Sequence, residues 1–354
     1  MSSYAIFRLP FEGHSSLMVQ HHGEPDKLQQ PADLGGRQGF VMAPFAASAA
    51  MPLLLLRPDS VCQLANDKPF PPDVVQLLAH AHLMDCDQRA RRQDWQAYAR
   101  TFSRFYGALQ TGTFLKLVLS RCRVVAHGGQ PSPLQLYLTA VSSFPRLFIA
   151  LVSMPRCGTW LVATPETLLS GRGDTWTTMA LAGTQKLQGS DLQGEGDRTV
   201  WDAKNIQEQR YVASYMAAQL QPFACQLQQS EPHTVRAANL VHLRSDFTFT
   251  LSQPQRVGQL LQALHPTPAV CGLPKEQARQ FILDNEPAPR RYYSGFMGPL
   301  MMPDTHLYVS LRCMEICRDA FCLHAGGGLV SGSCEEQEWL ETEAKMETMN
   351  RCLC

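Results

Sequence analysis

Runs of apolar residues separated by turn-forming residues recur along the chain and predict a protein rich in β-strands. The segments FVMAPF (40–45) and PLLLLRPD (52–59) have the composition of strands buried on at least one face. Apolar and polar positions alternate through 134–155 and 159–183, which predicts adjacent antiparallel strands and hairpins. Further strands are predicted in residues 114–121, 240–251, 290–300, 306–316 and 320–329.

Helical spacing of apolar residues marks fewer segments, which lie between these strands. In residues 93–109 it places Trp95, Tyr98 and Phe102 on one face, which is more typical of a packed core than of a cofactor site. Other helices are predicted in residues 73–82, 201–215 and 275–286 and after Ser333, whose hydroxyl suits an N-cap. At 354 residues the chain is long enough for two domains or for one large domain with two similar lobes.

Composition and charge exclude several classes of function. The 31 basic residues balance the 31 acidic ones, so no electrostatic footprint for nucleic acid or for an anionic membrane is visible. The sequence does not open like a signal peptide, and its most apolar stretch, 40–56, is interrupted by prolines and too short to span a bilayer. The twelve cysteines are scattered, and Cys313, Cys317 and Cys322 lack the paired CxxC spacing of zinc sites. We therefore expect a cytoplasmic protein with reduced, mostly buried thiols.

Three charged residues lie where the pattern predicts burial. Lys116 interrupts the apolar run FLKLVLSR. Burial lowers the pKa of a lysine, which suits it to act as a base. A lysine on an edge strand, where it guards against aggregation, explains the sequence equally well. Arg312 interrupts a later strand and suits bidentate recognition of a carboxylate. Glu208 falls in line with Val212 and Tyr215 on the buried face of a predicted helix, where either a metal ion or a salt bridge would compensate its charge.

Glu166 and a nearby bend of small residues add to the candidate chemistry. Glu166 lies in TPETLL, at a turn between two predicted segments, where apolar neighbours tend to raise the pKa of a carboxyl and suit it to act as a general acid. An N-capped turn explains the same sequence equally well. The segment ALAG (180–183) ends in a bend that would admit a substrate.

The stretch 321–349 combines three successive glycines with a helix rich in glutamate. We expect the glycines at 326–328 to take positive φ angles and to let the backbone approach a ligand. On the helix, Glu338, Glu341 and Lys345 fall within about 60° of one another, beside the face that should be buried. Carboxylates placed in this way could hold a hard cation, and a solvated face of charges is the alternative.

Five segments together resemble the motifs of one enzyme family. They are KLVLSR (116–121), TPETLL with ALAGT (164–184), KNIQEQ (204–209), LHPTPAVCGLP (264–274) and LHAGGGLVSGSCEEQEWLETEAK (323–345). In this order they resemble the chorismate-utilising enzymes, which include isochorismate synthase, salicylate synthase, anthranilate synthase component I and aminodeoxychorismate synthase. The HPTPAV loop resembles that of the isochorismate synthase branch, and so does Lys116, because ammonia-using members typically carry Gln at that position.

The resemblance implies an α+β fold whose large antiparallel sheets pack as a four-layer α/β/β/α sandwich, like that of anthranilate synthase component I. It implies one chorismate-binding domain over 1–354, in which 1–104 form a divergent N-terminal part and 105–350 carry the catalytic motifs. Two departures stand out. Gln209 occupies a position where relatives commonly carry His, and Gly327 one where they often carry alanine.

The resemblance also implies roles for individual residues. Family members bind the ring carboxylate of chorismate through Mg²⁺, and by motif match its ligands are Glu208 and Glu341, with Glu338 alongside. Lys116 matches the general base that activates water for attack at C2, and Glu166 the general acid that protonates the departing C4 hydroxyl. The substrate-binding positions implied by the match are Arg312, Gly326, Gly327 and Gly328 at the enolpyruvyl carboxylate, Lys345 near the metal-bound carboxylate, and Ala182, Gly183 and His242 along the ring.

The implied activity is Mg²⁺-dependent isochorismate synthase, serving menaquinone or alternatively siderophore synthesis. Salicylate synthase shares the same base, acid and metal and is the alternative activity. An inactive relative that binds chorismate is the alternative of another class. Lys116 implies that no amidotransferase subunit is needed, and we expect a monomer.

Overall fold

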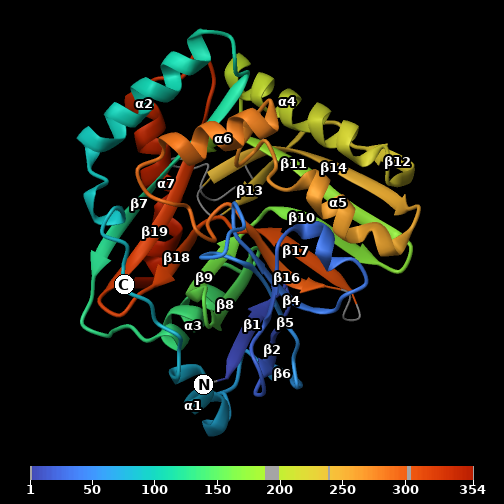
Figure 1. Cartoon of the computed structure of the whole chain (residues 1–354), viewed down its shortest axis with the longest axis vertical. Coiled ribbons are helices and arrows are strands. Elements are labelled where there is room, and N and C mark those ends of the chain that lie inside the picture. Colours follow the sequence, from blue (N-terminus) through green and yellow to red (C-terminus); the bar gives the residue numbers. More distant parts are fainter. Residues whose placement is uncertain (1, 188–198, 238–239, 301–303, 354) are drawn as a thin grey trace.

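The computed structural model describes residues 2–187, 199–237, 240–300 and 304–353 and shows two large antiparallel sheets flanked by helices (Figure 1). Sheet A has nine strands in the order β15-β7-β19-β18-β9-β8-β1-β2-β6, and sheet B has ten in the order β12-β14-β11-β10-β17-β16-β4-β5-β3, with β13 paired to β14. The predicted α+β sandwich is confirmed.

The strands of sheet A are β1 (Ser3–Arg8), β2 (His14–Gln20), β6 (Ser60–Ala65), β7 (Lys116–Ala126), β8 (Phe148–Met154), β9 (Gly158–Thr164), β15 (Gly272–Leu273), β18 (Cys313–Ile316) and β19 (Ala320–Leu329). Those of sheet B are β3 (Asp26–Leu28), β4 (Gly39–Ala43), β5 (Leu53–Leu56), β10 (Thr167–Arg172), β11 (Thr175–Lys186), β12 (Ala224–Gln229), β13 (His233–Ala237), β14 (Leu240–Leu251), β16 (Phe296–Leu300) and β17 (Thr305–Val309). The helices are α1 (Pro72–Ala79), α2 (Trp95–Gln110), α3 (Pro133–Ser143), α4 (Ala203–Leu220), α5 (Val257–Leu264), α6 (Lys275–Asn285) and α7 (Glu335–Leu353), with 3-10 turns η1 (Pro31–Leu34), η2 (Ala90–Arg92) and η4 (Pro254–Arg256).

The apolar runs of the sequence are continuous because both faces of many strands are buried. In β9, Trp160 belongs to the core between the two sheets, whereas its neighbour Leu161 packs in the core beneath α1, α3 and α7. In β4, Phe40 lies between the sheets and Val41 packs in the core beneath α4 and α5. The alternating sides therefore build one core between the sheets and one on the outer face of each sheet, which gives four layers.

Helices α2 and α6 cover the end of sheet A at which β7 lies (Figure 1). The rings of Phe105 on α2 and Phe281 on α6 meet edge to face, with their centroids 5.0 Å apart. The strands β7 and β19, the helices α4 and α7, and the bend in β11 all meet near this end of the sandwich, where the candidate site lies.

Two parts of the predicted secondary structure are wrong. Of the strand predicted in residues 290–300, only β16 forms, because residues 291–295 form turns and a bend. The pattern predicts strands in residues 134–143, but these residues form α3, which begins with Pro133 in its first turn. Its start is a capping box, in which the Ser132 hydroxyl accepts from the Gln135 amide and the Gln135 side chain accepts from the Ser132 amide. The end of the segment, β8, is a strand as predicted.

The first 104 residues contribute strands to both sheets. Strands β1, β2 and β6 lie in sheet A, and β3, β4 and β5 lie in sheet B. Removing this part would expose the apolar faces of strands in both sheets. We therefore propose that the chain folds as a single domain.

Candidate active site

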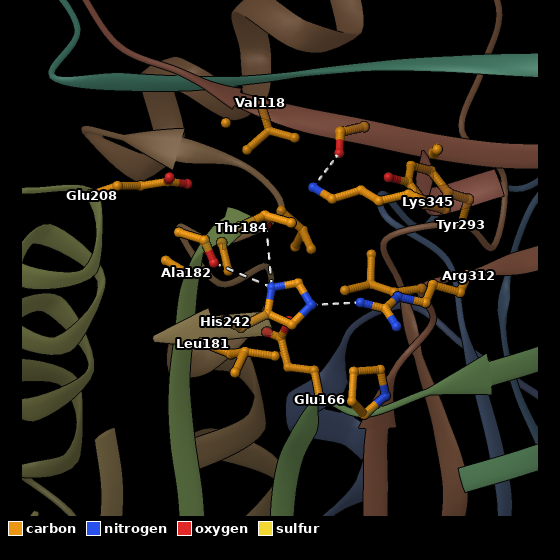
Figure 2. Close-up of a pocket in the computed structure, with 18 of the residues that line it drawn as sticks. Val118, Glu166, Leu181, Ala182, Thr184, Glu208, His242, Tyr293, Arg312 and Lys345 are labelled. Carbon is orange, nitrogen blue, oxygen red and sulfur yellow. Dashed lines mark hydrogen bonds between the residues drawn. The ribbon is translucent and has the colours of Figure 1, made fainter. Parts of the chain in front are cut away.

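A pocket lies between the two sheets, and most of the predicted site residues line it. Figure 2 shows His242 and Arg312 in its middle, Glu166 on one side, and Val118 and Lys345 on the other. The predicted residues that line it are Glu166, Ala182, Gly183, Glu208, His242, Arg312, Gly326, Gly328 and Lys345. The other four, Lys116, Gly327, Glu338 and Glu341, do not line it but adjoin residues that do.

Lys116 is 0% exposed, and its Nζ lies 2.8 Å from Oε1 of Glu208 on α4. Burial opposes ionisation of Glu208, but the ammonium of Lys116, with Lys345 and Lys204 further away, lowers the pKa of Glu208. Both charges predicted to be buried are therefore buried, and they compensate each other. Lys116 is therefore not a solvent-exposed lysine on an edge strand. In this structure the charge of Glu208 is compensated by a salt bridge, one of the two predicted possibilities.

Glu166 lies between β9 and β10, where the chain crosses from sheet A to sheet B, and is 3% exposed. Burial raises its pKa from 4.5 to about 7, against the opposing influence of Lys116, Lys345, Thr267 and Arg312. A carboxyl in this environment is about half protonated near neutral pH, as a general acid requires. Thr267 belongs to the loop 264–274, which explains why that loop is part of the site.

The bend predicted at 180–183 is a β-bulge. Gly183 has φ +72°, and the pairing of β11 with β14 shifts there between Ala182 and Thr184. A side chain at Gly183 would be strained in this conformation and would also press on Asn205, about 3.2 Å away. The bulge aims the Gly183 carbonyl at His242 of β14, whose Nδ1 lies 3.2 Å from it.

The tautomer of His242 follows from its neighbours. Nη2 of Arg312 lies 2.5 Å from Nε2 of His242, and because a guanidinium only donates, Nε2 must accept. The proton is therefore on Nδ1, which donates to the Gly183 carbonyl. Burial, with Arg312 and Lys345 nearby, lowers the pKa of His242 well below its usual value, so the imidazole is neutral. Burial lowers the pKa of Arg312 only to about 10, and it stays a cation facing the pocket.

The glycines at 326–328 lie within β19, and none has a positive φ, so that prediction is wrong. Their role is close approach. A Cβ on Gly328 would lie 2.3 Å from Oε1 of Glu208 and 2.9 Å from Cε of Lys116, and a Cβ on Gly327 would lie 2.6 Å from Oε2 of Glu338. A Cβ on Gly326 would meet the Tyr293 hydroxyl at 2.8 Å. The glycines thus leave room for functional side chains from α4, α7 and β7.

Helix α7 supplies the remaining charges. Nζ of Lys345 donates to Oε1 of Glu341 at 2.7 Å and to the Gly326 carbonyl at 2.9 Å. Glu338 is buried and accepts from Lys204 at 2.6 Å and from the Ser333 hydroxyl at 2.7 Å. The sequence predicts Ser333 as the N-cap of α7, but the helix begins at Glu335 and the Ser333 hydroxyl binds this carboxylate instead.

The donor set suits a hard divalent cation. Glu208, Glu338 and Glu341 offer carboxylate oxygens, the ligands that Mg²⁺ prefers. Within the described residues, Oε2 of Glu338 is buried without a hydrogen-bond partner, which leaves a lone pair for an ion. Burial and the neighbouring Glu341 raise the pKa of Glu338 to about 7, as expected for carboxylates that share a site. In this conformation the oxygens of the three acids do not all lie within 4.8 Å of one another; each acid is paired with a lysine.

Several residues of the site were not predicted. Lys204 lies one turn before Glu208 on the same face of α4, and that spacing would have indicated it. Tyr293 and His324 line the pocket with their rings stacked, 5.5 Å apart at their centroids. Local sequence pattern does not indicate them, because their contact joins the turn before β16 to β19.

Known proteins resemble this chain in sequence. The family profile described as "Chorismate binding enzyme" matches residues 75–354. The chain belongs to this family. It is 35% identical to isochorismate synthase DhbC of Bacillus subtilis (strain 168) over 257 residues, which are 68% of this chain and 64% of that protein. It is 37% identical to isochorismate synthase MenF of Escherichia coli (strain K12) over 188 residues, 52% of this chain and 43% of that one.

Solved structures show the same fold over nearly the whole chain. DhbC from Bacillus anthracis superimposes with a TM-score of 0.81 at 24% identity, covering 99% of this chain and 96% of that one. Anthranilate synthase component I from Streptococcus pneumoniae TIGR4 gives a TM-score of 0.67 at 16% identity, covering 98% and 89%. The matches to the two curated relatives span 64% and 43% of their lengths. No described helix is both long and apolar enough to cross a membrane.

Proposed function

We propose that this protein is an isochorismate synthase, which converts chorismate to isochorismate. The observation that carries the proposal is a pair of buried residues at the pocket. Lys116 adjoins the pocket from sheet A. Glu166, whose pKa of about 7 suits a general acid, lies where the chain crosses to sheet B. A base and an acid that approach one pocket from different elements suit a displacement in which one group enters and another leaves.

The reaction is an allylic displacement that balances without a co-reactant. Lys116 accepts a proton from water as the water oxygen bonds to C2. Both ring double bonds shift, from C1=C2 to C1=C6 and from C5=C6 to C4=C5, as the C4–O bond breaks. Glu166 gives its proton to the leaving hydroxyl, which departs as water. Because the Lys116 ammonium is paired with Glu208 at 2.8 Å in this structure, that pair must open and the ammonium lose its proton before Lys116 can act as the base.

The two carboxylates of chorismate need separate partners. Arg312 on one side and the β19 backbone on the other would hold the enolpyruvyl carboxylate. β19 pairs with β7 along one edge, and with β18 along the other edge only over residues 321–324. Within the described residues, that second edge is therefore not covered by β18 at 326–328. Neutral His242 fixes the Arg312 guanidinium in place through its Nε2 acceptor.

We propose Mg²⁺ as the cofactor, held by Glu208, Glu338 and Glu341. When bound, it supplies the positive charge that binds the ring carboxylate. Lys345 restrains Glu341, and Lys204 restrains Glu338, so both lysines orient the ligands. Lys116, in place of the Gln of ammonia-using relatives, supports an enzyme that needs no amidotransferase subunit.

The experiment that tests the function is product analysis after incubation of the purified protein with chorismate, with Mg²⁺ and separately with EDTA. We expect isochorismate only when Mg²⁺ is present. Salicylate formed together with equal amounts of pyruvate would instead show a salicylate synthase. Chorismate binding without conversion under either condition would show an inactive relative.

The pathway is the finer part of the proposal. We propose menaquinone synthesis, supported by the 37% identity to MenF of Escherichia coli, whose solved structure is described as that of the menaquinone-specific isochorismate synthase. Siderophore synthesis is the alternative, supported by the longer match to DhbC and by 31% identity to a vibriobactin-specific isochorismate synthase of Vibrio cholerae. Disrupting the gene and measuring cellular menaquinone separates them, since loss of menaquinone is expected only in the first case.

A further inference from the structure

Three cysteines outside the active-site pocket come together in the fold. The Sγ atoms of Cys86, Cys317 and Cys322 all lie within 4.8 Å of one another, and all three residues are buried. The distance is 3.2 Å between the thiols of Cys86 and Cys322 and 3.8 Å between those of Cys317 and Cys322. Cys313, which the sequence grouped with the last two, packs instead in the core between the sheets. The missing partner is Cys86, more than two hundred residues away.

Two local features create this cluster. Cys317 follows β18 and Cys322 lies in β19, so one tight connection, closed by the Cys317 amide donating to the Ala320 carbonyl, presents both thiols. The segment before α2 is fixed to that connection by a parallel bridge between Met84 and Cys317 and by a hydrogen bond from the Arg318 amide to the Met84 carbonyl. Cys86 therefore reaches the other two thiols from a separate part of the chain.

We propose that Cys86, Cys317 and Cys322 bind a thiophilic metal ion of the Zn²⁺ type, which joins the segment around Cys86 to sheet A. A Zn–S bond of about 2.3 Å in a tetrahedral site places sulfur atoms roughly 3.8 Å apart. The thiols already have close to this spacing. Cys122 of β7 is buried, its thiol contacts that of Cys322, and it is the candidate for a fourth ligand.

Metal binding would change the protonation of the cluster. Burial raises the pKa of the Cys86 thiol, so without metal it is a neutral thiol, and binding zinc releases its proton to solvent. The guanidinium groups of Arg91 and Arg291 lie near Cys86 and Cys317, and each is paired with a carboxylate, Arg91 with Asp319 at 2.6 Å and Arg291 with Glu315 at 2.9 Å. None of the cysteines lines the active-site pocket, so the proposed ion is structural.

The test uses the full chain, reduced and freed of metal with a chelator, and titrated with Co²⁺ and then Zn²⁺. We expect one equivalent of Co²⁺ to produce the intense absorption of sulfur-to-cobalt charge transfer, and one equivalent of Zn²⁺ to remove it. Co²⁺ bound to carboxylates gives no such band, so the active-site acids do not interfere. Native mass spectrometry of the zinc-bound protein then counts the displaced protons, and at least three are expected.

Matched variants assign the ligands. Cys86→Ser and Cys322→Ser should each weaken zinc binding by more than the ~10–100-fold that outer-shell changes cause at metal sites. Cys352→Ser is the control, because Cys352 is buried in α7 outside the cluster and its thiol donates to the Thr348 carbonyl, as a hydroxyl would. If the variants fail to fold, the cobalt spectrum and the proton count of the wild-type protein still decide whether the cysteines bind a metal ion. No charge-transfer band, a band that survives both cluster variants, or a Cys86–Cys322 disulfide with no metal uptake would overturn the proposal.

Discussion

Replacing Glu166 with Gln should greatly lower turnover and make the protein more stable, most of all at alkaline pH. Gln has nearly the shape of Glu but cannot ionise or donate a carboxyl proton. Burial raises the pKa of Glu166 from 4.5 to about 7, which corresponds to about 3 kcal/mol at 1.36 kcal/mol per pH unit. This free energy is what the folded state loses when the buried carboxyl is ionised.

The direction of the pH effect follows from proton counts. Below pH 4.5 the carboxyl is protonated in both states, so it contributes no difference. Between 4.5 and about 7 the unfolded chain has lost the proton while the folded protein keeps it, so stability falls as pH rises. Above about pH 7 the carboxyl is ionised in both states, and the loss of folding stability reaches its full value. We therefore expect Glu166→Gln to raise the free energy of unfolding by about 1 kcal/mol at pH 5 and about 3 kcal/mol at pH 8.5.

Urea unfolding of both proteins at the two pH values measures this difference, and comparison at one pH cancels the titration of other buried acids. The exposed Glu231, replaced by Gln, is the control and should change neither stability nor turnover. Turnover of Glu166→Gln should fall by about 10²–10⁴-fold, the usual contribution of a general acid. A stability gain that is equal at both pH values would refute the argument from burial. Near-normal turnover would refute the assignment of the acid.

Three further substitutions test the rest of the site. Lys116→Ala should reduce turnover by about 10²–10⁴-fold while calorimetry still detects chorismate binding by the folded protein, and normal turnover would exclude Lys116 as the base. Gly328→Ala places a methyl group 2.3 Å from Oε1 of Glu208 and should lower kcat about 10²-fold. The control Gly332→Ala, whose methyl group would have no atom within 4 Å, should leave kcat unchanged. Equal activity of the two variants would contradict the close-approach argument. Glu341→Gln should raise the Mg²⁺ concentration for half-maximal activity at least about tenfold, and an unchanged requirement would place the metal elsewhere.

The residues that could be predicted from the sequence share one property: a charge within an apolar pattern. Lys116, Glu208 and Arg312 each interrupt a run that had to be buried, and all three are buried. An ion on such a surface is too costly without a partner or a function, so the anomaly itself marks the site. What local pattern could not reveal is the partner, because Lys116 and Glu208 meet only when β7 and α4 are brought together.

Some of the wrong predictions also arise from contacts between segments that are remote in the sequence. Three successive glycines at 326–328 predict positive φ, whereas their backbone is an ordinary strand and the demand for glycine comes from α4 and α7. The pattern of residues 134–143 favours strands because its alternating, partly aromatic composition outweighs the Ser132 and Gln135 capping signals of α3. Cys86 could not be joined to Cys317 by spacing, since their contact depends on one bridge between remote segments.

The charges around the pocket give a physical reason for a divalent cation. Three lysines are paired with three glutamates, at 2.8 Å in Lys116–Glu208, 2.6 Å in Lys204–Glu338 and 2.7 Å in Lys345–Glu341. Each pair is neutral when its acid is ionised, His242 is uncharged, and Glu166 is neutral while protonated. Arg312 faces the pocket with a single positive charge, whereas chorismate carries two carboxylates. A bound Mg²⁺ would turn this deficit of positive charge into an excess, which is why the acids are expected to hold an ion when the substrate enters.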